Sequence, residues 1–198
     1  MEKSLAEKYM LSPEDILKVI ARSPRCEQMV KGFVAEYHLE RKLDDLVAAG
    51  KIMAYQRLDR DGQPDFLITT ADGSLKLECK MFMSAKSSQR GYKVDFQKTR
   101  NSPGDPLSRF YRRADFDILA ACTYNQNERW DFVFIWTVDL PIDEKAGQDC
   151  LKKAVYYRQG DPLWSTSLEE ILDHNGQEYV AKRTPSVQAQ LNVDESDD

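Results

Sequence analysis

Residues 64–82, PDFLITTADGSLKLECKMF, contain two runs of alternating apolar and polar side chains on either side of an Ala-Asp-Gly-Ser segment. Alternation with a period of two is typical of β-strands, and Asp-Gly is a frequent centre of a tight hairpin turn. With residues 72–73 as the two central turn residues, Asp65 lies opposite Lys80. Glu78 then shares a face with both, at one end of the hairpin. A three-residue loop would shift this parity unless a bulge restored it.

Two helices are predicted ahead of this hairpin. Ser12 is an expected N-cap with Pro13 in the first turn, and the helix that follows should end near residues 23–24. Apolar side chains recur at helical spacing from about residue 26 to residue 49, where Gly50 supplies the stop. This second helix is expected to pack on the sheet.

Further strands and helices are predicted around the hairpin from the same kinds of pattern. Strand-like runs occupy 51–58, 91–100, 116–124 and 130–138, whereas 107–116 can form a short helix and 167–174 a capped one. Residues 149–158 fit either a strand or a helix. This order of elements predicts an α/β (α+β) fold with a mixed central sheet flanked by helices.

Composition limits the classes of protein that the chain can represent. Its 198 residues are 41% hydrophobic and 31% charged, which is the balance of a globular protein. The longest apolar run is too short for a membrane span and the first thirty residues carry no signal pattern, so we expect a cytoplasmic protein without a membrane partner. Four separated cysteines and two histidines offer no disulfide framework, zinc knuckle or Ser-His-Asp triad. A bound metal would therefore need oxygen ligands.

Positive charge is concentrated directly after the hairpin, although the net charge of the chain is -5. Residues 76–113 contain ten Lys or Arg against three Asp or Glu. Such a segment suits contact with a phosphate backbone, and the alternative is an ordinary solvated basic face.

The hairpin residues also suggest a chemistry. Two carboxylates that converge on a rigid strand end repel each other unless a cation lies between them, and oxygen ligands suit Mg²⁺, with Mn²⁺ as a substitute. Such an ion can activate a water molecule against a phosphate. Lys80 beside it can orient that water and contact the phosphate.

Pro64-Asp65, followed after twelve residues by Glu78-Cys79-Lys80, resembles the PD-(D/E)XK signature of restriction endonuclease-like nucleases. The resemblance implies a restriction endonuclease-like fold in which Asp65, Glu78 and the backbone carbonyl of Cys79 hold the metal, while Lys80 assists the attacking water. It also implies DNA cleavage in restriction, phage defence or repair, leaving 5′-phosphate and 3′-hydroxyl ends.

Further candidate residues follow from this resemblance. Glu36, one turn after Gly32 on the long predicted helix, is a candidate catalytic residue and metal ligand, with Glu40 as its substitute. Gln97 is a candidate site residue on the strand after the signature. The candidate nucleic-acid contacts are Lys98, Arg100, Arg109, Arg112 and Arg113.

We expect four parts along the chain, of which the resemblance covers only about residues 32–138 in the second. Residues 1–25 are an N-terminal helical extension, 26–140 the PD-(D/E)XK nuclease core, 141–184 a C-terminal extension of the same domain, and 185–198 a disordered acidic tail. DNA is the expected partner, with RNA as an alternative substrate. A homodimer is a candidate assembly because cutting both strands of a duplex needs two sites.

Two other functions remain open at this point. One is a catalytically inactive nucleic-acid-binding or interaction module on the same fold. The other is a winged-helix-like transcription module, suggested by LERKLDDLVAAGKI at 39–52 ahead of the strands.

Overall fold

The structure is a computed structural model that describes residues 3–58, 60, 62–83, 89–98, 104 and 106–173. Arg100 and the predicted acidic tail at 185–198 lie outside the described residues. The elements follow in the order α1 Leu5–Tyr9, α2 Pro13–Arg22, α3 Pro24–Ala48, β1 Ala54–Arg57, β2 Phe66–Thr70, β3 Gly73–Met81, β4 Tyr92–Asp95, β5 Ile118–Cys122, α4 Tyr124–Asn127, β6 Phe132–Trp136, a 3-10 helix at Thr137–Asp139, and β7 Ala154–Tyr157.

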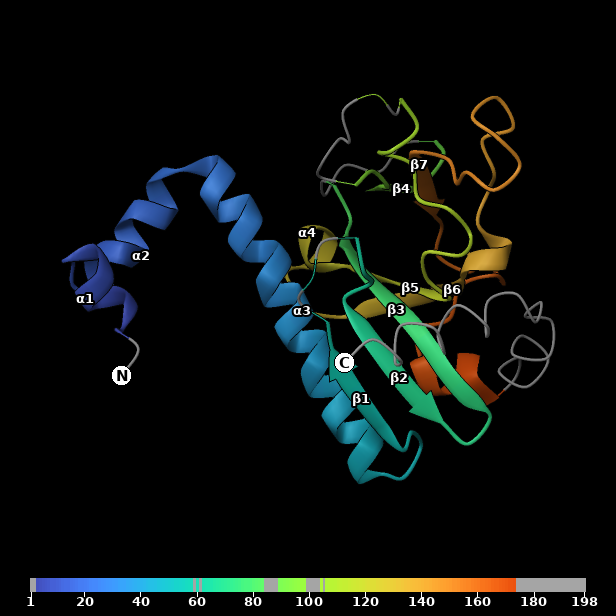
Figure 1. Cartoon of the computed structure of the whole chain (residues 1–198), viewed down its shortest axis with the longest axis horizontal. Coiled ribbons are helices and arrows are strands. Elements are labelled where there is room, and N and C mark those ends of the chain that lie inside the picture. The colour runs from blue at the N-terminus through green and yellow to red at the C-terminus, as the bar shows by residue number, and fades with distance from the viewer. Residues whose placement is uncertain are drawn as a thin grey trace.

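The centre of the fold is a five-stranded sheet with the order β1-β2-β3-β5-β6 (Figure 1). Its neighbours are antiparallel except for β3 and β5, which run parallel. The predicted mixed sheet flanked by helices is therefore confirmed. The winged-helix interpretation is wrong, because the chain after α3 enters this larger mixed sheet. β4 and β7 form a separate antiparallel pair, joined to the end of β3 by a bridge between Phe82 and Val94.

The two helices predicted ahead of the hairpin are confirmed. α2 begins after Ser12, whose side chain caps it as expected. α3 begins at Pro24, about two residues earlier than predicted, because the Ser23 side chain caps its first turn. It ends just before Gly50, whose φ of 69° is a conformation that glycine adopts at no steric cost.

The sheet separates two apolar layers. On one face α3 contributes Ala35, Leu39 and Leu43, which are all fully buried. The other face is covered by a second cluster, here called the aromatic layer, whose largest members are Phe82, Phe96, Tyr111 and Phe116. β5 and β6 are buried at every position because both of their faces are covered.

The hairpin of β2 and β3 forms with a register two residues away from the predicted one. Thr70 pairs with Gly73 and Leu67 with Lys76, so Ala71 and Asp72 form the turn. The Thr70 hydroxyl donates to the Gly73 carbonyl at 2.9 Å and accepts from the Asp72 N–H at 3.3 Å, which closes the turn one residue early. A shift of two residues keeps every side chain on its predicted face.

The short helix predicted at 107–116 is wrong. Phe110 forms a bridge with Gln97, and Arg112 forms one with Cys150. The Leu151 N–H donates to the Tyr111 carbonyl at 2.8 Å. These bonds to neighbouring segments replace the local ones that a helix would supply.

The two patterns after residue 140 are resolved by the structure. Residues 149–158, which fitted either element, contain the strand β7. Residues 168–173 are helical. Ser167 is the N-cap of this helix, because its hydroxyl accepts from the Glu170 N–H at 3.3 Å. None of the helices in the described ranges has the length and apolar character needed to cross a membrane.

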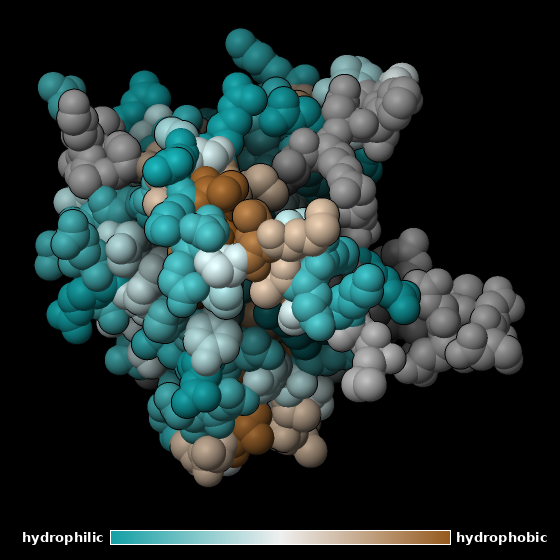
Figure 2. Space-filling model, turned by 90° about the vertical axis from the view of Figure 1, so that its left-hand side faces the viewer, coloured by the Kyte–Doolittle hydropathy of each residue, from teal (hydrophilic) through white to brown (hydrophobic). Residues whose placement is uncertain are grey.

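α1 and α2 lie beside the start of α3, away from the sheet (Figure 1), and neither contains a buried residue. Exposed apolar side chains on them include Leu5, Met10 and Leu17. Figure 2 shows apolar areas among a mostly hydrophilic surface on this side of the molecule. The division of the chain into extension, core and C-terminal parts stays a prediction.

The packing of α3 on the sheet can be tested with one substitution at two sites. Leu39→Ala removes a fully buried side chain and should lower the free energy of unfolding by about 2–5 kcal/mol. Leu17→Ala makes the same change at a residue with 64% exposure and should alter the free energy of unfolding by no more than about 0.5 kcal/mol. Urea denaturation measures both, and similar losses in the two variants would contradict the described packing.

Candidate active site

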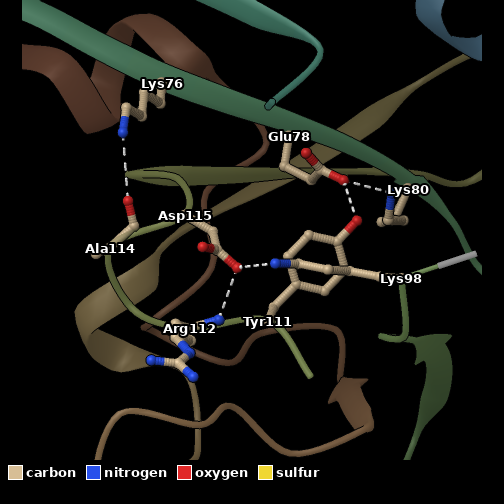
Figure 3. A network of polar contacts seen from close by, with 8 residues as sticks. All are labelled: Lys76, Glu78, Lys80, Lys98, Tyr111, Arg112, Ala114 and Asp115. Atoms are coloured by element: carbon tan, nitrogen blue, oxygen red, sulfur yellow. Dashed lines mark hydrogen bonds and ion pairs between the residues drawn. The ribbon is translucent and has the colours of Figure 1, made fainter. Parts of the chain in front are cut away.

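Glu78 and Lys80 are two residues apart on β3, and both side chains face the aromatic layer. The Glu78 side chain is almost fully buried, with the residue only 3% exposed. The Lys80 ammonium donates to the Oε1 atom of Glu78 at 2.5 Å, and the Tyr111 hydroxyl donates to the same oxygen at 2.5 Å (Figure 3). The buried carboxylate thus has a cationic and a neutral donor, which offset the cost of removing it from water.

Asp65, which directly precedes β2, is tied to the same strand by its side chain. Its Oδ2 atom accepts a hydrogen bond from the Cys79 N–H at 2.7 Å. Extending the observed register places position 65 opposite Glu78 rather than opposite Lys80, which corrects the predicted pairing. The face predicted for the three residues is retained, and the Pro-Asp and Glu-Cys-Lys parts of the motif lie side by side.

The electrostatics of these groups are strongly coupled. Burial, and after it the charge of Glu78, raise the pKa of Asp65 to about 7. The charge of Lys80 and the hydrogen bond from the Cys79 N–H lower this pKa and offset part of the rise. Burial alone would lower the pKa of Lys80, but the neighbouring negative charge, that of Glu78 foremost, outweighs it and raises that pKa. The site therefore holds a permanent cation beside a carboxylate that takes up a proton near neutral pH.

Glu36 projects from α3 toward the same region but has a partner of its own. Its carboxylate accepts from the Arg57 guanidinium at 2.8 Å, and Glu40 lies 3.6 Å from that guanidinium. Burial raises the pKa of Glu36, while the charges of Arg57 and Lys80 oppose this rise. Sequence reasoning missed Arg57, although its place in the first predicted strand was a signal that it could face the long helix.

Tyr111 is the second residue that sequence reasoning assigned differently. It lies in the segment 107–116 that is predicted as a short helix, whereas the structure places its hydroxyl on Glu78. Burial and the charge of Glu78 raise the pKa of this hydroxyl, so it remains a donor. No local signal marks it, because its contact with Glu78 spans 33 residues of sequence.

Gln97 does not join the Asp65, Glu78 and Lys80 group. Its side chain donates to Asp95 at 3.3 Å, and within the described residues it has no hydrogen bond to any of those three. Gln97 stays a predicted site residue without a contact that supports the role.

The basic candidates differ in how freely they can meet a phosphate. Arg109 and Arg112 are exposed, although the Arg109 Nε atom donates to the Lys98 carbonyl at 3.3 Å, and Arg113 is only half-exposed. The Arg113 guanidinium donates to the Val138 carbonyl at 3.2 Å, and the Lys98 ammonium is paired with Asp115 at 2.7 Å (Figure 3). Arg109 and Arg112 are therefore the more available pair.

The residues can be compared with the needs of a metal ion. Across the ranges that the structure describes, no three or more His, Cys, Asp and Glu side chains are grouped so that they could hold one. Asp65 and Glu78 nevertheless supply two neighbouring carboxylates, and Mg²⁺ is often held by one or two carboxylates with water and phosphate as its other ligands. Burial and the charge of Glu78 raise the pKa of Asp65, so a cation beside the two carboxylates would offset an unfavourable charge. The donor set therefore fits a hard divalent cation.

Comparisons with known proteins add a similarity of fold. No family model and no curated protein matches the chain. Among solved structures, the chain is similar to the bacterial homing endonuclease I-Ssp6803I with a TM-score of 0.45 and 17% sequence identity, covering 79% of this chain and 97% of that one.

The raised pKa of Asp65 has a consequence for stability. Because this pKa is about 7 in the folded protein against an ordinary value of 3.8, the folded state holds a proton between these pH values that the unfolded chain has released. The free energy of unfolding should then fall as pH rises from about 4 to about 7. Asp65→Asn removes this pH dependence. Without divalent cations, the free energy of unfolding of the variant relative to that of the unaltered protein should therefore be about 1–3 kcal/mol greater at pH 8 than at pH 5.

Urea denaturation in EDTA at the two pH values measures this gain. Asp72→Asn, on the exposed hairpin turn, is the matched control and should show no such gain. If Asp65→Asn changed the free energy of unfolding equally at pH 5 and pH 8, the uptake of a proton by Asp65 on folding would be contradicted.

Proposed function

We propose that the protein is a metal-dependent nuclease that hydrolyses phosphodiester bonds in DNA. The observation that carries the proposal is the meeting of Asp65, Glu78 and Lys80 at one point on β3, with the two carboxylates close enough to raise the pKa of Asp65. Perturbed carboxylates beside a fixed cation are frequent at sites of proton transfer and metal binding.

In this proposal Asp65 and Glu78 hold Mg²⁺, or Mn²⁺ in its place. The Cys79 carbonyl and Glu36 are further candidate ligands, the latter after release from Arg57. When bound, such an ion supplies Lewis-acid stabilisation of the phosphate charge and lowers the pKa of a bound water.

Lys80 acts on the substrate side of the site. Its raised pKa keeps it charged, so it can bind a non-bridging phosphate oxygen and orient the attacking water. The water oxygen forms a bond to phosphorus as the bond to the 3′ oxygen breaks. The attacking water releases a proton to solvent and the leaving 3′ oxygen takes one up from solvent, which gives 5′-phosphate and 3′-hydroxyl ends.

One observation favours the second function, a nucleic-acid-binding module that hydrolyses nothing. Glu78 already has Lys80 and Tyr111 as partners, and Asp65 has the Cys79 N–H, so one oxygen of each carboxylate already accepts from the protein itself. Salt-sensitive DNA binding without cleavage, across Mg²⁺ and Mn²⁺ concentrations, would select this function.

Cleavage provides the direct test. Plasmid, linear single-stranded DNA and RNA are incubated with the purified protein in Mg²⁺, with and without EDTA. Lys80→Met should lower the rate about 100-fold or more, because it removes the group that orients the water. Glu78→Gln should lose Mg²⁺-dependent cleavage, whereas Glu14→Gln on the exposed surface of α2 should retain it. Undiminished cleavage by both site variants would refute the assignment.

We expect the exposed arginines to contribute to DNA affinity only by electrostatic attraction to the phosphates, independently of the base sequence. Removal of Arg109 and Arg112 together should lower the affinity for any sequence and reduce the slope of log K against log salt by about two. Binding is measured in the Glu78→Gln background to prevent cleavage. Arg22→Ala with Arg25→Ala makes the same charge change near the start of α3 and should leave the slope unchanged; equal effects of the two pairs would exclude a specific basic surface.

A further inference from the structure

The Tyr111 hydroxyl and the Lys80 ammonium bind the same oxygen of Glu78. Both donate to Oε1 at 2.5 Å (Figure 3). Within the described residues, no hydrogen bond reaches the other oxygen, Oε2. One end of the carboxylate is thus held by two donors while the other stays open to a ligand.

The ring that carries this hydroxyl is held by its surroundings. Its centroid lies 4.7 Å from that of Phe96 and 5.7 Å from that of Phe116. The Tyr111 carbonyl accepts from the Leu151 N–H at 2.8 Å. Two ammonium groups, those of Lys80 and Lys98, lie 5.3 and 5.4 Å from the ring centroid. A side chain packed in this way presents its hydroxyl with little freedom to move.

Lys80 has two tasks that conflict. In the proposed function it acts on the water and the phosphate, yet in this structure its ammonium is bound to Glu78. If Lys80 alone held Glu78, its movement toward the substrate would leave the buried carboxylate without a donor, which is costly. A donor from another segment of the chain removes this conflict.

We propose that Tyr111 is the positioning residue of the site: its hydroxyl holds Glu78 through Oε1, so that Oε2 remains available to a divalent cation and Lys80 can turn to the substrate. This inference rests on the proposed nuclease function. Tyr111 touches neither substrate nor cation, and it acts through Glu78. Residues that orient a metal ligand in this way typically change metal affinity or activity 10- to 100-fold when they are mutated.

Tyr111→Phe in the full chain tests the inference, because it keeps the packed ring and removes only the hydroxyl. Mn²⁺ binding without DNA is measured by calorimetry, and DNA cleavage is measured as kcat and KM. The Mn²⁺ dissociation constant should rise about tenfold and kcat should fall about 10- to 100-fold, with KM changed less than about twofold. Tyr157→Phe, which also removes a hydroxyl beside the aromatic layer, is the matched control and should change neither quantity.

Each outcome has a distinct meaning. If the unaltered protein binds Mn²⁺ and cleaves DNA while Tyr111→Phe does both equally well, the positioning role is overturned and the nuclease function stands. If the unaltered protein does neither, the nuclease function fails and this inference fails with it. Loss of the folded state in Tyr111→Phe, seen by circular dichroism, would assign the hydroxyl to core stability and overturn the positioning role. A weaker Mn²⁺ affinity in a folded Tyr111→Phe protein supports it.

Discussion

The burial of a carboxylate on a central strand is the constraint on which the rest of the structure depends. Glu78 lies on β3, the middle strand of five, and is almost completely removed from water. An isolated charge at such a position would be too costly to keep, so its donors must be part of the fold. One donor, Lys80, comes from the same strand, but the other, Tyr111, requires the segment before β5 to pack against this face. The aromatic layer therefore both covers the sheet and completes the site.

The alternation of β3 lets a single strand serve two layers at once. Leu77 and Cys79 belong to the cluster under α3, while Glu78 and Lys80 face the other way. The backbone takes part as well, because the Cys79 N–H binds the Asp65 carboxylate. The strand thereby holds one acid through its main chain and presents another through a side chain. Because packed interiors transmit strain, we expect a change in the packing of α3 to alter the site through this shared strand.

Local pattern was sufficient for part of the site and insufficient for the rest. Period-two alternation predicts that Glu78 and Lys80 share a face whatever the turn, and the structure agrees. The register depended on which residues form the turn, and the Thr70 side chain moved it by two positions. Tyr111 and Arg57 could not be assigned because their partners, Glu78 and Glu36, lie 33 and 21 residues away in the chain. Such contacts are decided by tertiary packing, which periodicity does not encode.

Asp65 gives the strongest reason to regard this group as functional rather than structural. A fold optimised for stability would not place a second carboxylate where burial and the charge of Glu78 raise its pKa to about 7. Among the residues that the structure describes, Lys80 is the only one whose ammonium binds the pair, and its hydrogen bond goes to Glu78. An unfavourable arrangement of this kind persists when it serves a task such as binding a cation, because the ion turns the repulsion between the two carboxylates into a shared attraction. In the proposed nuclease, the same electrostatic imbalance that lowers the stability of the folded protein would be the property that suits it to hold a divalent ion against phosphate.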